Sequence, residues 1–123
     1  MSFRILIADD QVEQLNAVVA LLGNCEYTIE VAYNGSDALS MLLNNSFDLS
    51  LLDMHMPDLT GLEVLGHLQQ ANSAVPSILM TGQPSRDIEL AALELGVITM
   101  LRKPIPAELL RLTVNQIFSR NHG

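Results

Sequence analysis

The sequence predicts an α/β fold in which five parallel strands form a doubly wound sheet between two layers of helices. Five short β-like runs alternate with segments of helix length along the 123 residues. Three of these runs are too uniformly apolar for a sheet with one face in water, so we expect helices on both faces. No linker, repeat or low-complexity segment interrupts the alternation. Residues 1–123 are therefore predicted to form a single domain, with an ordered core from about residue 3 to residue 119.

The predicted strands are short, and most of them end beside a polar residue. The first, third and fourth are the uniformly apolar ones. In chain order the predicted strands are Phe3–Ala8, Thr28–Ala32, Asp48–Leu52, Ser77–Thr81 and Ile98–Leu101.

Apolar residues at helical spacing predict one helix after the first strand and another after the second. Gly23 ends the first helix, and the second begins at Asn34–Ser36. The apolar stripes of these two helices are Val12, Leu15, Val18, Val19 and Leu22, and then Ala38, Leu39, Leu42 and Leu43.

Capping signals predict where the remaining helices begin. Thr60 and Glu63 have the spacing of a capping box, in which each side chain accepts a free amide of the helix end. Ser85 is predicted to cap a fourth helix that continues to Leu95. Proline is favoured in a first turn, so a fifth helix is predicted over 106–119.

The predicted fifth helix carries more apolar residues than one stripe needs. We expect one set to face the sheet and a second set to form an apolar flank beside Met100 and Leu101. This flank is either a pairing surface or a contact covered by neighbouring structure. The first set is Leu109, Leu112 and Gln116, and the second is Leu110, Val114 and Ile117, with Phe118 left over.

Right-handed crossovers between parallel strands favour the flavodoxin-like strand order 2-1-3-4-5. This order makes the first and third strands neighbours at the switch point of the sheet, where ligands bind outside the carboxyl ends of the strands. Asp9 and Asp10 follow the first strand, and Asp53 follows the third. The three carboxylates are therefore predicted to converge at this edge.

Thr81 and Lys103, at the ends of the fourth and fifth strands, are predicted to line the same edge. Each of these polar residues alone has a plain structural explanation, such as a helix cap or a turn. Polar groups at four strand ends on one edge are much less expected by chance. Lys103 is also the only lysine of the chain, so it does not belong to a population of solubilising surface lysines.

The charges at this edge indicate a bound cation. Two carboxylates about 4 Å apart repel by roughly 4 kcal/mol at an effective dielectric constant of 20, so three will not stay ionised together without compensation. Oxygen ligands favour Mg²⁺, with Mn²⁺ as a second option, over zinc. A carboxylate beside a divalent cation, an ammonium and a hydroxyl is a suitable acceptor for a phosphoryl group.

The whole chain resembles a receiver domain of the response-regulator family, of the chemotaxis-regulator type. The resemblance is carried by ILIADD (Ile5–Asp10), LLDMHMPDLTGLEVL (Leu51–Leu65), ILMTG (Ile78–Gly82) and RKP (Arg102–Pro104). It implies two-component signalling, in which Asp53 accepts phosphate from the phosphohistidine of a histidine kinase or a histidine phosphotransfer protein. It also implies an output surface formed by the fourth helix, the fifth strand and the fifth helix.

The resemblance further implies roles for the residues around Asp53. Asp10 and Asp53 would bind Mg²⁺ directly, together with the backbone carbonyl of His55, while Asp9 would act largely through water. Two more roles concern the phosphoryl group and the lysine. Thr81 and Lys103 would hold the phosphoryl oxygens, and the Lys103–Pro104 peptide bond would be cis.

Three positions bear on the properties of the phosphoryl site and on how its state is transmitted to the rest of the domain. Met100 stands where the family usually has Tyr or Phe, three residues before the lysine, so we expect its coupling to Thr81 to survive in weakened form. Methionine can fill an inward or an outward pocket, and ordinary packing is an equally good explanation. His55 and Gln83 flank the phosphoryl group in the family; for His55 a solvent-facing ring is the plainer expectation.

Composition excludes several classes of function. With 14 acidic and six basic residues the net charge is −8, which argues against nucleic acid binding by this domain. No apolar run reaches the roughly 18 residues of a membrane span, and the first residues do not form a signal peptide. The single cysteine, Cys25, allows no internal disulfide. We therefore expect a cytoplasmic domain without membrane association.

Three alternatives compete with a phosphoacceptor. The 4% aromatic content and the absence of Trp disfavour a flavodoxin-type electron carrier. A Mg²⁺-dependent phosphatase with an aspartyl nucleophile would have a second acid where this chain has His55. A degenerate receiver that only docks partners stays open as the alternative. We expect a switch that phosphorylates and dephosphorylates itself, and not an enzyme with an external substrate; a homodimer is compatible with it.

Overall fold

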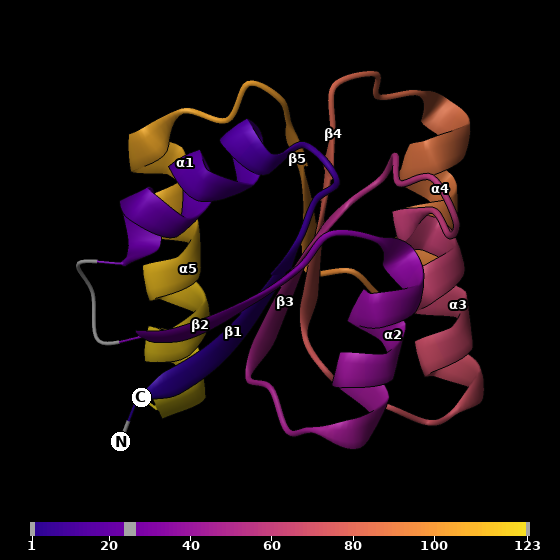
Figure 1. The fold of residues 1–123 in the computed structure, drawn as a ribbon, viewed down its shortest axis with the longest axis horizontal. Helices are drawn as coiled ribbons and strands as arrows, with labels where there is room; N and C mark the ends of the chain where they lie inside the picture. Colours follow the sequence, from indigo (N-terminus) through magenta and orange to yellow (C-terminus); the bar gives the residue numbers. More distant parts are fainter. Residues whose placement is uncertain (1, 24–26, 123) are drawn as a thin grey trace.

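The structure is a computed structural model that describes residues 2–23 and 27–122, of which 120–122 are described by their backbone alone. Strands and helices alternate from one end to the other (Figure 1). The strands are β1 (Phe3–Ala8), β2 (Tyr27–Ala32), β3 (Leu49–Asp53), β4 (Ser77–Thr81) and β5 (Thr99–Arg102). The helices are α1 (Val12–Leu22), α2 (Gly35–Asn44), α3 (Gly61–Gln70), α4 (Arg86–Glu94) and α5 (Ala107–His122).

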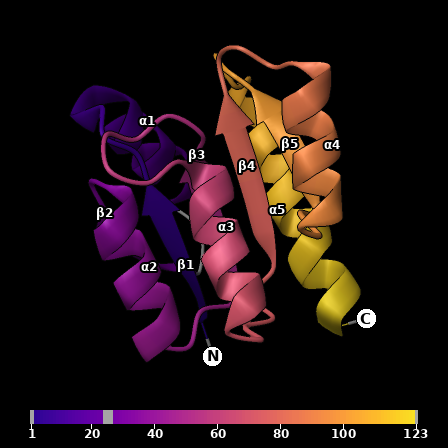
Figure 2. The ribbon, with the colours of Figure 1, turned by 90° about the vertical axis from the view of Figure 1, so that its right-hand side faces the viewer.

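The five strands are parallel and form one sheet in the order β2-β1-β3-β4-β5. Helices α1 and α5 cover one face, while α2, α3 and α4 cover the other (Figures 1 and 2). The predicted fold class and strand order are confirmed. The β1–β3 pairing places the chain after Ala8 beside the end of β3, so Asp9 and Asp53 share one edge.

Each face of the sheet has its own hydrophobic core, because successive side chains of a strand point to opposite faces. In β1, Ile5 and Ile7 pack toward α1 and α5, whereas Leu6 and Ala8 pack toward α2, α3 and α4. β3 and β4 are buried along their whole length. This double burial explains the uniformly apolar strand sequences.

Capping contacts hold three helix starts, and two of these caps, at Thr60 and Ser85, were predicted from the sequence. Asn34 and Ser85 each accept an amide of the helix that follows. At α3, Thr60 accepts the Glu63 amide at 3.1 Å, and the Glu63 carboxylate accepts the Thr60 amide at 2.9 Å. This complete capping box fixes the helix that begins after the Asp53 loop.

Several element boundaries differ slightly from the prediction. β3 and β5 each begin and end one residue later than predicted, at Leu49–Asp53 and Thr99–Arg102, and their last residues pair with Met80 and Thr81 of β4. Two apolar residues assigned to buried stripes, Val12 and Leu43, are about half exposed. The other differences are that β2 begins one residue early at Tyr27, α4 stops at Glu94, and α5 begins at Ala107 and continues past the predicted end to His122, whereas α2 starts at Gly35, within the predicted range.

The predicted orientation of α5 is wrong. The buried residues are those assigned to the flank, whereas Leu109 and Leu112 are 46% and 56% exposed. A stripe at i, i+4, i+7 and i+8 carries four apolar side chains, and the predicted stripe included the polar Gln116. The residues of α5 that face the sheet are Leu110, Val114, Ile117 and Phe118.

The predicted apolar flank changes accordingly. Leu101 is buried in the core beneath α1 and α5, so it does not lie on a surface with Met100. Cys25 lies outside the described residues. Among those that the structure does describe, no helix combines the length and the apolar character needed to cross a bilayer.

Candidate functional site

Three carboxylates meet at the carboxyl edge of the sheet. Asp9 and Asp10 directly follow β1, and Asp53 is the last residue of β3. One carboxylate oxygen of each residue lies within 4.8 Å of the other two. Asp9 and Asp53 are buried, whereas Asp10 is exposed. The adjacency of β1 and β3 therefore brings together the three acids that the sequence predicted to converge.

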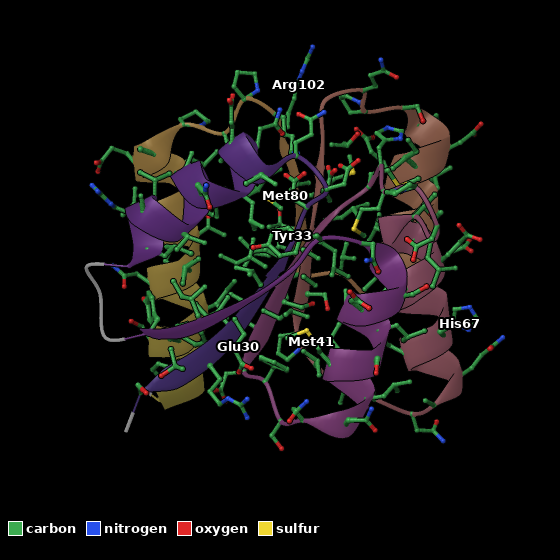
Figure 3. All side chains as sticks on the ribbon, viewed as in Figure 1. Glu30, Tyr33, Met41, His67, Met80 and Arg102 are labelled. Atoms are coloured by element: carbon green, nitrogen blue, oxygen red, sulfur yellow. The ribbon has the colours of Figure 1, made fainter. Side chains whose placement is uncertain are left out.

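Lys103, directly after β5, reaches into this group. Its Nζ lies 2.8 Å from Asp9 Oδ2 and 3.0 Å from Asp53 Oδ1. It also donates to Gln14 Oε1 at 2.7 Å. The Lys103–Pro104 peptide bond is cis, as the resemblance implied. By contrast, the preceding Arg102 points away from the fold into solvent (Figure 3).

The protonation equilibria reflect this crowding. Burial raises the pKa of Asp53, the charges of Asp9 and Asp10 raise it further, and Lys103 only partly opposes them. Burial lowers the pKa of Lys103, but its hydrogen bonds to Asp9 and Asp53 outweigh this, so the net shift is upward. One ammonium therefore leaves part of the negative charge around Asp53 uncompensated.

These residues fit the divalent cation that the sequence predicted. Three carboxylates supply hard oxygen donors close together, which is the ligand type of Mg²⁺ and Mn²⁺. Asp9 already uses both oxygens, because Oδ1 accepts the Gln11 amide at 2.9 Å and Oδ2 accepts Lys103. Asp10 and Asp53 are the acids better placed to bind a metal directly.

Thr81 is buried at the end of β4, and the backbone links it to Lys103. The Lys103 amide donates to the Thr81 carbonyl at 2.8 Å. The Thr81 hydroxyl accepts the amide of Gln83 at 3.1 Å. The backbones of Thr81 and Lys103, the two residues predicted to bind the phosphoryl group, are therefore adjacent at this edge of the sheet.

The predicted modulating residues lie in the two loops after β3 and β4. His55 and Gln83 are both exposed. Gln83 contacts the site through its backbone amide, which donates to the Thr81 hydroxyl. His67 is also exposed, on α3 (Figure 3). The exposure of His55 agrees with the solvent-facing residue that the sequence led us to expect.

Met100 is half-buried and packs against the core on the α2, α3 and α4 side. It pairs with Leu79, two residues before Thr81 in β4. Side chains two residues apart in a strand share a face, so Met100 and Thr81 lie on the same side of the sheet. This is the placement that a coupling between them requires.

Two residues of the edge were missed from the sequence. Gln14 lies in the first turn of α1, and the first turn of a helix that directly follows a strand lies at the edge where that strand ends, which was a signal for its position. Asp58 accepts the amides of Gly35, Ser36 and Leu59 at 2.8, 2.9 and 2.8 Å, which ties the loop after Asp53 to the start of α2. Asp in a loop often accepts nearby amides, but the contact with α2 needed the fold.

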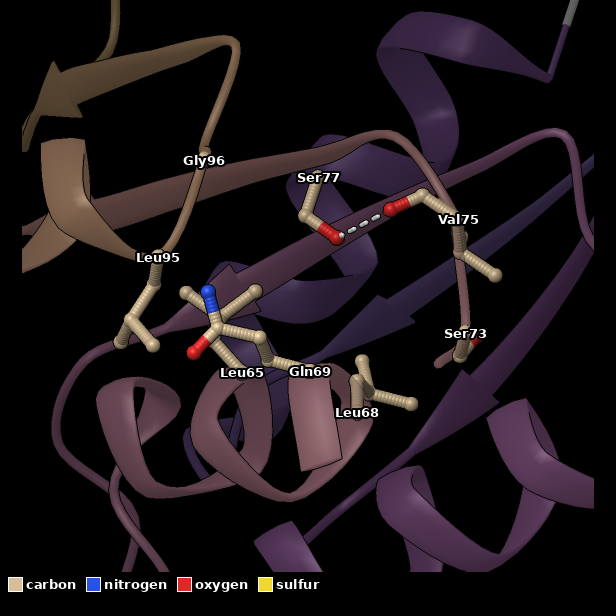
Figure 4. A pocket seen from close by; sticks show the side chains of 8 residues that line it. All are labelled: Leu65, Leu68, Gln69, Ser73, Val75, Ser77, Leu95 and Gly96. Carbon is tan, nitrogen blue, oxygen red and sulfur yellow. Dashed lines mark hydrogen bonds between the residues drawn. The ribbon is translucent and has the colours of Figure 1, made fainter. Parts of the chain in front are cut away.

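A small cavity lies at the opposite edge of the sheet, near the start of β4 (Figure 4). Its volume is about 70 Å³, and Leu65, Leu68, Val75, Ser77 and Leu95 line most of it. The Ser77 hydroxyl donates to the Val75 carbonyl at 3.1 Å. The cavity has no ionisable lining residue and is far smaller than the roughly 300 Å³ of a small-molecule site.

The sequence profile of the response regulator receiver domain matches residues 5–115. The chain belongs to this family. It is 33% identical over 112 residues to the transcriptional regulatory protein ZraR of Klebsiella oxytoca, covering 91% of this chain and 25% of ZraR. It is 32% identical over 105 residues to the transcriptional regulatory protein DltR of Streptococcus agalactiae, covering 85% of this chain and 47% of DltR. This receiver chain thus spans from a quarter to half of these relatives.

Solved structures agree with the family. The signal receiver domain of an HD domain-containing protein from Pseudomonas fluorescens Pf-5 superposes with a TM-score of 0.91 at 28% identity. The match covers 99% of this chain and 98% of that one. The chain is therefore a response regulator receiver domain of two-component systems in both sequence and fold.

Proposed function

We propose that this receiver domain accepts a phosphoryl group on Asp53, in a Mg²⁺-dependent transfer from the phosphohistidine of a histidine kinase or a histidine phosphotransfer protein. The observation that carries the proposal is the position of Asp53. It is buried at the strand end, 3.0 Å from the only lysine, with oxygens of two further carboxylates within 4.8 Å.

The transfer replaces one bond to phosphorus by another. An Asp53 carboxylate oxygen forms the new P–O bond while the P–N bond of the donor breaks, and the leaving imidazole keeps the electron pair and is protonated by water. Asp10, Asp53 and the carbonyl of His55 would hold the metal, with Asp9 acting through water. The bound cation would neutralise phosphoryl oxygens during transfer.

Lys103 and Thr81 would hold the phosphoryl group once it is attached. Lys103 turns part of its hydrogen bonding from the Asp53 oxygen to a phosphoryl oxygen. The Thr81 hydroxyl, now an acceptor for the Gln83 amide, has its own proton free to donate to another oxygen. Movement of Thr81 would be passed on through Met100 on the same face of the sheet.

The surface formed by α4, β5 and α5 is the proposed output face. Within the described part of the chain, eight large apolar side chains are more than 45% exposed, and five of them lie on α4, on α5 or just before β5. They are Leu90, Leu93, Ile98, Leu109 and Leu112. Exposed apolar side chains on these elements favour a protein partner, an output domain or a second copy of the chain. The net charge of −8 argues against direct nucleic acid binding by this domain. The single cysteine of the sequence supports a cytoplasmic signalling role.

Phosphorylation of the purified domain tests the proposal. Incubation with Mg²⁺ and a small acyl phosphate should add one phosphoryl group, seen by intact-protein mass spectrometry and lost in excess chelator. Asp53→Asn should abolish the adduct, whereas Asp37→Asn, at an exposed acid of α2, should retain it. A chain that takes up no phosphoryl group, or takes it up equally without Asp53, would contradict the proposal and favour a docking module.

A further inference from the structure

Gln14 lies in the first turn of α1 and completes the surroundings of Lys103. In many helices a Glu or Gln at this third position reaches back to the backbone of the capping residue. Here Gln11, the capping residue, makes no side-chain cap, and its amide donates to Asp9 Oδ1 instead. The Gln14 carboxamide is thereby left to accept from Lys103 Nζ at 2.7 Å.

The Lys103 ammonium makes three close contacts. It donates hydrogen bonds to Asp9 Oδ2 at 2.8 Å and Gln14 Oε1 at 2.7 Å, and it forms an ion pair with Asp53 Oδ1 at 3.0 Å. An ammonium has three donors, as many as these contacts. Gln14 is the only neutral partner among the three.

A neutral acceptor suits the electrostatics of this edge. Two carboxylates contact the lysine and a third lies close to them, and a phosphoryl group adds a charge of about −1.5 to −2. A fourth carboxylate in place of Gln14 would repel that group. A carbonyl oxygen orients the ammonium without adding net charge.

We propose that Gln14 is a positioning residue that holds Lys103 in place for the phosphoryl group; this inference rests on the proposed function. When a phosphoryl group occupies Asp53, Lys103 must redirect one proton toward a phosphoryl oxygen. Its bonds to Asp9 and Gln14 keep Nζ at the same position during this change. Without Gln14 the flexible lysine side chain samples more positions and meets the phosphoryl oxygens less often.

The single lysine of the chain makes a direct test available. With ¹⁵N-lysine labelling, the Nζ signal belongs to Lys103 alone, and exchange of its protons with water reports on its hydrogen bonds. Gln14→Leu should speed this exchange about threefold to tenfold and weaken the binding of beryllofluoride with Mg²⁺ by a similar factor, the scale of one lost hydrogen bond. Asn16→Leu is the matched control, because this exposed amide of α1 makes no side-chain hydrogen bond among the described residues, and it should change neither value.

The variant Gln14→Glu tests whether Gln14 acts by positioning Lys103 or by being uncharged. It keeps an oxygen that accepts from Lys103, so the Lys103 protons should still exchange slowly with water. The added negative charge should weaken beryllofluoride binding in a salt-dependent manner. Unchanged exchange and affinity in Gln14→Leu would overturn the inference. Failure of the wild-type protein to bind beryllofluoride would count against the proposed function, whereas the exchange measurement would still decide whether Gln14 holds Lys103.

Discussion

Asp9 and Asp58 each accept hydrogen bonds that link chain segments near Asp53, the proposed phosphoacceptor. Asp9 divides its oxygens between the Gln11 amide and Lys103, and so joins β1, α1 and β5 at one point. Asp58 accepts three backbone amides and joins the loop after Asp53 to the start of α2. Single carboxylates thus position backbone segments that are far apart in the sequence.

At Asp58 this bonding predicts a pH dependence of stability. The hydrogen bonds from Ser36, followed by those from Leu59 and Gly35, hold the pKa of Asp58 well below its ordinary value of about 4. A lowered pKa in the folded state means that the stabilisation is complete above the ordinary pKa. It is lost as the pH falls through the lower value.

Asp58→Asn should therefore lower the free energy of unfolding at pH 7, and the difference from wild type should shrink as the pH falls below about 4. Urea unfolding between pH 3 and pH 7 measures this. Asp87→Asn is the control, since this exposed carboxylate accepts no hydrogen bond within the described residues. A difference that stays constant with pH would count against the hydrogen-bonded carboxylate as its source.

At the scale of elements, α3 packs directly against the end of β3. A Cβ on Gly61 would lie 2.6 Å from Leu79 Cδ1 and 2.7 Å from the Asp53 carbonyl. The Gly61 amide also donates to the Met54 carbonyl at 3.0 Å. The absence of a side chain at Gly61 lets the capped helix approach the residue that carries the proposed chemistry.

Gly61→Ala should lower the free energy of unfolding by about 1–3 kcal/mol and slow phosphorylation, because the helix must move away from Asp53. Gly66→Ala in the same helix should instead raise it by about 0.5–1 kcal/mol, because no atom lies within 4 Å of the added Cβ. Denaturant unfolding and a phosphorylation time course compare the two variants. Equal stability of both would disprove the close approach as the cause.

The neighbouring strands β4 and β5 hold Thr81 and Met100, the two residues whose coupling we propose. Met100 and Thr81 share one face of the sheet next to α4, and methionine fills this position with less area than an aromatic ring. Met100→Tyr should strengthen the effect of beryllofluoride on amide hydrogen exchange in α4. Met100→Leu, which keeps the aliphatic volume, should leave that effect unchanged; an unchanged effect in Met100→Tyr would contradict the coupling.

At the scale of the whole molecule, α5 is fastened to the sheet by an aromatic cluster. The Phe118 ring stacks on Phe3 with centroids 4.0 Å apart and planes at 3°, and it contacts Tyr27 at 5.3 Å. The exposed side of the same helix carries Leu109 and Leu112. The helix therefore contributes to the core with one side and to the proposed output face with the other.

Phe118→Ala should lower the free energy of unfolding by about 3–5 kcal/mol, the range for removing a buried aromatic ring. Leu112→Ala removes an exposed side chain and should change it by less than about 0.5 kcal/mol. Thermal and urea unfolding measure both. Similar losses in the two variants would be incompatible with the orientation of α5 in the structure.

Most of the fold and the charged residues of the site could be predicted because they depend on local patterns. Strand ends are marked by the change from apolar runs to Asp53, Thr81 and Lys103, and the crossover rule assembles these ends on one edge. The three helix caps need only residues within one turn. The orientation of α5 could not be obtained in this way, since two apolar stripes compete within that helix.

The sequence by itself determined the family, the strand order and the three acids, the hydroxyl and the lysine of the carboxyl edge, because each follows from short motifs and a general topological rule. Only the tertiary structure decided which side of α5 is buried, how Asp58 is tied to α2, and that Gln14 holds Lys103. The last contact joins residues 89 positions apart. Such contacts depend on how packed elements are placed relative to one another, and no local pattern encodes that placement.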